Sequence, residues 1–241
     1  MTKNGIDVSR FQGVIDWAAV KAAGVDFAII KAGGSDDGFY TDSAYERNYA
    51  GAKAAGVPVG AYYYVGRLCI SREDGIADAK RFLAMLEGKQ FEYPVYIDLE
   101  ETDPKNKAGA TDAVIGFCET MEAAGYYCGI YASDISGFKD RLELSRLTAF
   151  DRWVANYISQ PGYVGGYGMW QRSSQGRVNG ITGNVDIDES YLDYPAIIKA
   201  NGLNGFPKPE QPKPQEPPKK SIKITVEYDD HIFSGLLEEQ L

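Results

Sequence analysis

The apolar residues of this chain gather into short continuous runs, and each run follows an alanine-rich segment that ends at glycine. The clearest copies are Ala22-Ala23-Gly24 before residues 26–30, Ala54-Ala55-Gly56 before residues 58–64, and Ala123-Ala124-Gly125 before residues 126–131. Glycine in this position is the usual left-handed end of a helix. Apolar runs without polar alternation are typical of parallel strands that are buried on both faces. The pattern therefore predicts repeated helix–strand units.

The spacing of these glycines supports the same interpretation. A looser fourth copy ends at Gly88, so the four glycines at 24, 56, 88 and 125 lie 32, 32 and 37 residues apart. About 30 residues is the length of one strand–helix–strand step. Asp16 and Ser71 precede two of the helical segments, and both residue types are favoured N-caps.

Beyond about residue 142 the helical pattern fades, and short strands joined by Gly/Ser-rich loops replace it. Candidate strands lie at 151–157, 167–173 and 184–188. The whole pattern then contains about eight strands but only about five helices. An α/β fold in which the strands close into a TIM-like barrel, with the final helices missing, is the simplest arrangement.

The C-terminal end does not continue the barrel pattern. Residues 207–220 hold six of the eleven prolines and no other apolar residue, which predicts an extended linker. In residues 221–241, Ile222, Ile224 and Val226 alternate with polar residues, and Asp229-Asp230 can turn the chain. We therefore predict three parts: a barrel at 1–206, a Pro/Lys-rich linker at 207–220, and a short β-hairpin at 221–241.

Composition excludes several kinds of function. The 241 residues carry 25 Lys and Arg against 34 Asp and Glu, a net charge of −9, which argues against nucleic-acid binding by a basic surface. No window approaches the ~18 apolar residues of a membrane span, so no membrane insertion is expected. Cys69, Cys118 and Cys128 have no metal-ligand spacing and are predicted to be reduced core thiols; His231 is the single histidine. We expect no metal and no cofactor, and any chemistry must use carboxylates.

Four carboxylates stand at the ends of predicted strands. Asp98 and Glu100 end the strand at 93–100 and lie two residues apart, so they share a face. Asp7 ends the first candidate strand and Asp186 ends the last one, and these strands are neighbours in a closed barrel. Crowded carboxylates raise one another's pKa. A carboxylic acid that stays protonated near neutral pH can act as the general acid of a glycosidase.

Several motifs together resemble those of glycoside hydrolase family 25 lysozymes. They are Gly5-Ile6-Asp7-Val8-Ser9 with Phe11-Gln12-Gly13 and Asp16-Trp17, then Tyr96-Ile97-Asp98-Leu99-Glu100, Gly129-Ile130-Tyr131, Trp153-Val154-Ala155-Asn156-Tyr157, and Trp170-Gln171 followed by Gly180-Ile181-x-Gly183-x-Val185-Asp186. They occur in the family's order and cover roughly residues 4–195. The resemblance implies a flattened barrel of eight strands and five helices.

The resemblance also implies an activity and a set of roles. The family cleaves the β-1,4 bond between N-acetylmuramic acid and N-acetylglucosamine in peptidoglycan glycan strands. By resemblance, Glu100 is the general acid and Asp98 assists the substrate acetamido group in a retaining route, with an inverting route left open. Asp7 and Asp186 would maintain the protonation state of Asp98 and Glu100, and they would bind the sugar or the attacking water.

Polar and aromatic residues at later strand ends are the candidate substrate contacts. They are Tyr63, Tyr131, Trp153, Asn156, Tyr157 and Gln171. Apolar sugar faces stack on aromatic rings. Ordinary barrel packing is the alternative for each ring.

Two other readings compete with a muramidase. One is a catalytically silent glycan-binding module, and the other is a host autolysin of the same family. The N-terminus lacks the apolar stretch of a secretory signal. With the proline linker, this makes the chain resemble a phage or prophage endolysin, which is made in the host cytoplasm and reaches the cell wall by holin-type export. The hairpin at 221–241 is expected to associate with copies of itself, with docking on the barrel or wall binding as alternatives.

Overall fold

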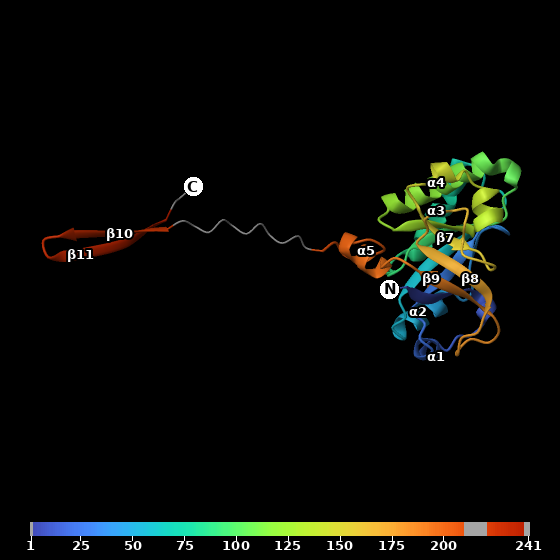
Figure 1. Ribbon diagram of the computed structural model, residues 1–241, viewed down its shortest axis with the longest axis horizontal. Helices are drawn as coiled ribbons and strands as arrows, with labels where there is room; N and C mark the ends of the chain where they lie inside the picture. Colours follow the sequence, from blue (N-terminus) through green and yellow to red (C-terminus); the bar gives the residue numbers. More distant parts are fainter. Residues whose placement is uncertain (1, 210–220, 239–241) are drawn as a thin grey trace. The chain divides into compact units, whose positions relative to one another are not determined.

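The computed structural model describes residues 2–209 and 221–238. The chain divides into two compact units, residues 1–209 and residues 210–241, which are described separately below (Figure 1). This division lies three residues after the domain boundary that the proline run predicts. Most of the predicted linker, residues 210–220, falls outside the described residues.

Eight strands of the larger unit close into a barrel. They are β1 (Lys3–Val8), β2 (Phe27–Gly34), β4 (Val59–Val65), β5 (Val95–Leu99), β6 (Cys128–Ser133), β7 (Asp151–Ala155), β8 (Met169–Gly176) and β9 (Val185–Ser190), with a two-residue strand β3 (Tyr40–Thr41) beside β2. The order around the barrel is β1-β9-β8-β7-β6-β5-β4-β2, and β2 pairs with β1 to close it. Most pairs are parallel, but β9 is antiparallel to both β8 and β1. The predicted eight-stranded barrel is confirmed.

Five α-helices accompany these strands in the described residues, as the sequence predicts. They are α1 (Trp17–Ala22), α2 (Tyr45–Ala54), α3 (Arg72–Leu86), α4 (Lys107–Ala123) and α5 (Tyr194–Asn201). Asp16 and Ser71 cap α1 and α3 by accepting backbone N–H groups of the first turn. The glycines at 24, 56, 88 and 125 all have positive φ, between 70° and 87°. Short turns at Arg10–Gln12, Pro104–Asn106, Asp134–Lys139 and Leu144–Arg146 complete the connections. No described helix is long and apolar enough to cross a membrane.

Aromatic side chains fill the inside of the barrel. The ring of Trp153 lies 4.4 Å from that of Tyr131, 5.2 Å from that of Tyr96 and 6.0 Å from that of Tyr62, measured between centroids. Tyr194 of α5 packs in the same cluster. The outer faces of the strands pack on the helices through a separate, mostly aliphatic cluster. Cys69, Cys118 and Cys128 are buried free thiols, as predicted.

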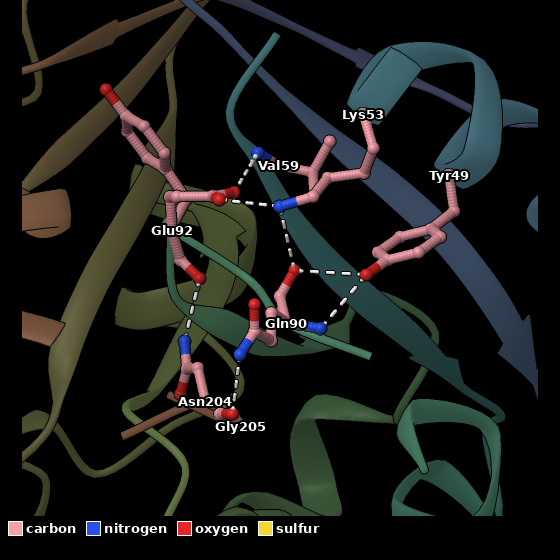
Figure 2. Close-up of polar contacts among 8 residues, drawn as sticks. Tyr49, Lys53, Val59, Gln90, Glu92, Asn204 and Gly205 are labelled. Atoms are coloured by element: carbon pink, nitrogen blue, oxygen red, sulfur yellow. Dashed lines mark hydrogen bonds and ion pairs between the residues drawn. The ribbon is translucent and has the colours of Figure 1, made fainter. Parts of the chain in front are cut away.

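Buried Asn204 fixes the end of the larger unit to the barrel. Its side chain donates to the Tyr93 carbonyl oxygen over 2.9 Å and accepts from the Tyr127 N–H over 2.7 Å. Its own carbonyl accepts from the Phe91 N–H. Figure 2 shows this residue beside the segment that leads into β5, where Glu92 pairs with Lys53 of α2. The segment after α5 is therefore part of the barrel's packing.

The smaller unit contains the hairpin that the sequence predicts. Strands β10 (Ser221–Tyr228) and β11 (His231–Glu238) pair antiparallel along their whole length. Asp229 and Asp230 connect them with φ of 46° and 64°. Two consecutive positive φ values are those of a type I′ turn, and Asp tolerates them better than most residues.

Candidate active site

The four predicted carboxylates, from strands β1, β5 and β9, do meet at the mouth of the barrel. Asp98 on β5 lies in register with Tyr64 on β4 and Tyr131 on β6, and Asp7 on β1 lies opposite Asp186 on β9. One part of the expectation is wrong: Asp186 stands at the start of its strand, not at its end. It still reaches the mouth, because β9 runs antiparallel to β1.

A hydrogen-bond network holds Asp7 in the floor of the site. The Gln171 amide donates to Asp7 Oδ2 over 2.7 Å. The other end of that amide, Oε1, accepts from the Tyr131 hydroxyl over 2.8 Å and from the Tyr157 hydroxyl over 2.7 Å. Tyr131 and Gln171 are buried, whereas Tyr157 is 52% exposed. Of these three, Tyr157 is the side chain most open to a bound sugar.

A fifth carboxylate, Asp188, belongs to the same cluster. It is fully buried two residues after Asp186, and its Oδ1 accepts from the Trp153 indole N–H over 2.8 Å. Burial is the main cause that raises the pKa of Asp188 to about 8, and nearby Asp186 adds to it. Burial, followed by the charges of Asp188 and Asp186, raises the pKa of Asp7 well above its usual range. The pKa of Asp186 rises to about 6, again mainly through burial.

Asp98 and Glu100 share one buried cation, Lys31. Burial and then the charge of Glu100 raise the pKa of Asp98 well above its usual range, and Lys31 opposes this shift. The pKa of Glu100 is also raised, first by lost hydration, with Lys31 acting against it. The Lys31 ammonium lies 4.3 Å from the centroid of the Tyr64 ring. Asp98 Oδ1 has no hydrogen-bond partner in the described residues, whereas the Glu100 residue is exposed.

Glu100 borders an open cleft of about 460 Å³. The cleft is lined by Glu100, Tyr131, Ser133, Asp134, Ile135, Ser136, Ala155, Asn156, Tyr157 and Ile158. Asp134 fixes one wall, because its carboxylate accepts the backbone N–H groups of Gly162, Tyr163 and Val164. Among the catalytic candidates, Glu100 is the carboxyl group that this cleft exposes to a ligand.

Three predicted substrate contacts do not present a free side chain to the cleft. Tyr63 points outward: it is fully buried against Phe82 and Phe117 of the helices and donates to Asp78. The placement of Tyr63 at the mouth is therefore wrong, because the even-numbered residues of β4 face inward. Trp153 is only 1% exposed, and it contributes to the site by donating its indole N–H to Asp188. Asn156 lines the cleft, but its side-chain oxygen accepts the N–H groups of Ile158 and Ser159 in its own loop.

Two site residues could have been found from sequence. Lys31 interrupts an otherwise apolar strand, Phe27–Gly34, that is buried along its whole length. A lysine in such a strand is expected to serve a partner at the mouth. Asp188 follows Asp186 by two residues, the spacing that already identifies Asp98 with Glu100. Within the described residues, no group of three or more His, Cys, Asp or Glu side chains is arranged to hold a metal ion.

A closed barrel with acidic side chains gathered at its mouth, one of them facing an open cleft, is the arrangement of a glycosidase. The sequence comparison gives the family. The model of glycosyl hydrolases family 25 matches residues 6–181, and the chain belongs to this family.

Individual relatives agree with this assignment. The chain is 33% identical over 186 residues to the autolytic lysozyme of Clostridium acetobutylicum, which covers 77% of this chain and 55% of the relative. It is 29% identical over 205 residues to lysozyme M1 of Streptomyces globisporus, which covers 76% of this chain and 65% of that lysozyme. The chain therefore spans between about half and two thirds of these relatives. The crystal structure of the CTP1L endolysin superposes with a TM-score of 0.70 at 28% identity, covering 83% of this chain and 70% of the endolysin.

Proposed function

We propose that this protein is an N-acetylmuramidase that hydrolyses the β-1,4 bond between N-acetylmuramic acid and N-acetylglucosamine in peptidoglycan. The observation that carries this proposal is the position of Glu100. It is the exposed member of a carboxyl cluster in a family 25 barrel, and it borders the cleft. The relatives of this chain that are named lysozyme or endolysin support peptidoglycan as the substrate.

Glu100 is the proposed general acid that protonates the leaving glycosidic oxygen. Lost hydration raises its pKa, which favours the protonated form that this role needs. Asp98, adjacent on the same strand face, would orient and stabilise the acetamido group of the sugar. That group's carbonyl oxygen then attacks the anomeric carbon in place of an enzyme nucleophile, giving a retaining reaction. Asp7 and Asp186 would bind the attacking water. They would also maintain the protonation state of Asp98 and Glu100.

Mass spectrometry of digested peptidoglycan tests the proposal. We expect new reducing ends on muramic acid. New reducing ends on glucosamine, cleaved peptide bonds, or wall binding without any cleavage would contradict it; the last result would indicate a silent glycan-binding module. Proton NMR of the first product anomer separates the two routes, because a retaining enzyme releases the β-anomer and an inverting enzyme the α-anomer.

Metal-independence is part of the proposal. The carboxyl groups are needed as a proton donor and as electrostatic partners, and a bound cation would hold them deprotonated. Activity is expected to survive EDTA. A loss that calcium or zinc restores would contradict this assignment of roles.

The proposed setting is that of a phage or prophage endolysin. The likeness to the CTP1L endolysin supports it. In this setting the protein is made in the host cytoplasm, crosses the membrane by holin-type release, and acts on the wall. Lysis of a host that expresses the chain only when a holin is co-expressed would support this setting; lysis without a holin would contradict it. A homo-oligomer formed through the C-terminal hairpin is also proposed, and its grounds follow.

A further inference from the structure

One face of the C-terminal hairpin carries mostly apolar side chains, with His231 at its end opposite Tyr228. The other face carries Ile232 and Leu236 among polar residues. Directly opposite residues of an antiparallel pair point to the same side. Val226 pairs with Phe233 and Ile224 with Gly235, so these residues share a face with Ile222 and Tyr228. Ile222, Ile224, Val226, Tyr228 and Phe233 are 41% to 73% exposed. We call these five residues, with Gly235, the hairpin apolar face.

Such an element needs a partner to be stable. An isolated two-stranded hairpin is marginal in water, and domains below about 40 residues usually rely on disulfides, metals or association. Residues 221–241 contain no cysteine and a single histidine. The stabilising contact must therefore come from another surface that covers the apolar face.

We propose that the partner is the same hairpin in other copies of this chain. Residues 221–241 carry one lysine against five acidic residues, so anionic wall polymers or lipid headgroups would repel this segment. Glu227 lies on the opposite face, and Asp229 and Asp230 form the turn. Copies packed through their apolar faces therefore keep these charges in water.

The shape of the face fits a copy of itself. A Cβ atom built on Gly235 would meet nothing within 4 Å, so an open notch lies opposite Ile224. In a symmetric assembly each copy supplies both a protruding side chain and a notch. Strands of eight residues give a face of roughly 27 by 10 Å, about 270 Å² per copy. Two such faces bury about 540 Å², less than half of the ~1,200 Å² of a standard interface, so we expect an association that strengthens with protein concentration.

Light scattering of the full-length chain in solution tests the proposal. The expected mass is at least twice that of the 26.4 kDa chain and is expected to rise with protein concentration. Ile224→Glu places a charge in the apolar face and is expected to give monomers, whereas Thr225→Glu, on the opposite face of the same strand, is expected to leave the mass unchanged.

Other outcomes overturn the proposal. A wild-type monomer would do so, and so would an Ile224→Glu variant with the same mass as wild type. If the wild type is monomeric and Ile224→Glu lowers the thermal stability of the barrel, the hairpin docks on its own barrel instead. If the monomer sediments with cell walls and Ile224→Glu does not, the face binds the wall. These readouts do not depend on muramidase activity, and circular dichroism confirms that each variant is folded.

Discussion

Glu100 is the exposed acid of the cluster, whereas Asp186 is only partly exposed. Asp7, Asp98 and Asp188 are each at most 5% exposed. A buried carboxyl group can shape the local charge, but a proton donor must reach the glycosidic oxygen. The division of labour among these acids follows from their burial as much as from their identity.

Replacing Glu100 with Gln is expected to lower turnover by about 10²–10⁴-fold while leaving the fold intact, since that is the usual contribution of a positioned general acid. Release of reducing sugar ends from purified peptidoglycan measures the effect. Glu101→Gln removes an exposed carboxylate from the next residue and should stay within a few-fold of wild type. Near-normal turnover in Glu100→Gln would show that another group is the acid.

Asp188→Asn is expected to make stability less dependent on pH. The pKa of Asp188 is about 8 in the native state and ~3.9 in an unfolded chain, so the native state binds more protons between these values. Its contribution to stability is therefore full below about pH 4 and is lost as pH rises to about 8. Asn still accepts the Trp153 N–H without acquiring a charge.

Urea unfolding at pH 5 and pH 8 measures this effect. The difference in free energy of unfolding between Asp188→Asn and wild type should be more favourable to the variant at pH 8 than at pH 5, by more than about 1 kcal/mol. Glu189→Gln is the control: it removes a partly exposed carboxylate that pairs with Arg172 on the outer surface, so its effect should be small at both pH values. Equal stability changes in Asp188→Asn at the two pH values would refute the raised pKa.

Strand-end position predicts Asp7, Asp98 and Glu100 from the sequence, because parallel strands in a barrel deliver their C-terminal residues to one mouth. Asp186 reaches the same mouth from the start of an antiparallel strand. The sequence does not settle which of two adjacent tyrosines faces inward. The prediction for Tyr63 is one residue out of phase, because both faces of β4 are apolar and the alternation of side chains gives no signal. Asp188 follows Asp186 at the spacing that relates Asp98 to Glu100, but its complete burial depends on contacts that form only in the closed barrel.

At the level of elements, the wall of the cleft depends on one carboxylate. Asp134 lies in a short turn after β6 and accepts three consecutive backbone N–H groups of the loop between β7 and β8. That loop carries Tyr157 and Ile158, which line the cleft. A carboxylate that accepts several backbone donors holds a loop more firmly than neutral side chains do.

Asp134→Ala is expected to loosen this wall, since three backbone donors lose their acceptor. Stability should fall by about 1–3 kcal/mol, and KM for peptidoglycan should rise more than kcat falls. Limited proteolysis should then cut within residues 156–168 faster than in wild type. Asp140→Ala, at an exposed site six residues later, is the control. Unchanged cleavage and KM in Asp134→Ala would mean that the loop is held by other contacts.

Most elements could be predicted from the chain alone. Glycine after each helix and the buried apolar runs mark the β/α units, and N-caps at Asp16 and Ser71 mark helix starts. The direction of β9 could not be predicted, because the residue pattern of a short strand is the same for parallel and antiparallel pairing. Pairing with β1 and β8 decides it, and that depends on contacts far apart in sequence.

For the whole molecule, the net charge of −9 opposes an approach to cell walls that carry peptide carboxylates. Salt screens such repulsion, and the screening length falls from ~30 Å at 0.01 M to ~8 Å at 0.15 M. Lysis of walls is therefore expected to accelerate several-fold over this range. Hydrolysis of a short uncharged glycan oligomer should change little. Faster wall lysis at low salt would contradict the expectation.

The three hydrogen bonds that Asn204 makes with Phe91, Tyr93 and Tyr127 have a consequence for protein engineering. They join the segment after α5 to the barrel before the proline run begins, so we expect the larger unit to fold without the residues beyond Pro209. Different C-terminal modules can then be exchanged beyond this point without redesigning the barrel, provided that residues 202–206 are kept. A fusion made upstream of Asn204 would instead leave buried N–H groups at 91 and 127 without an acceptor.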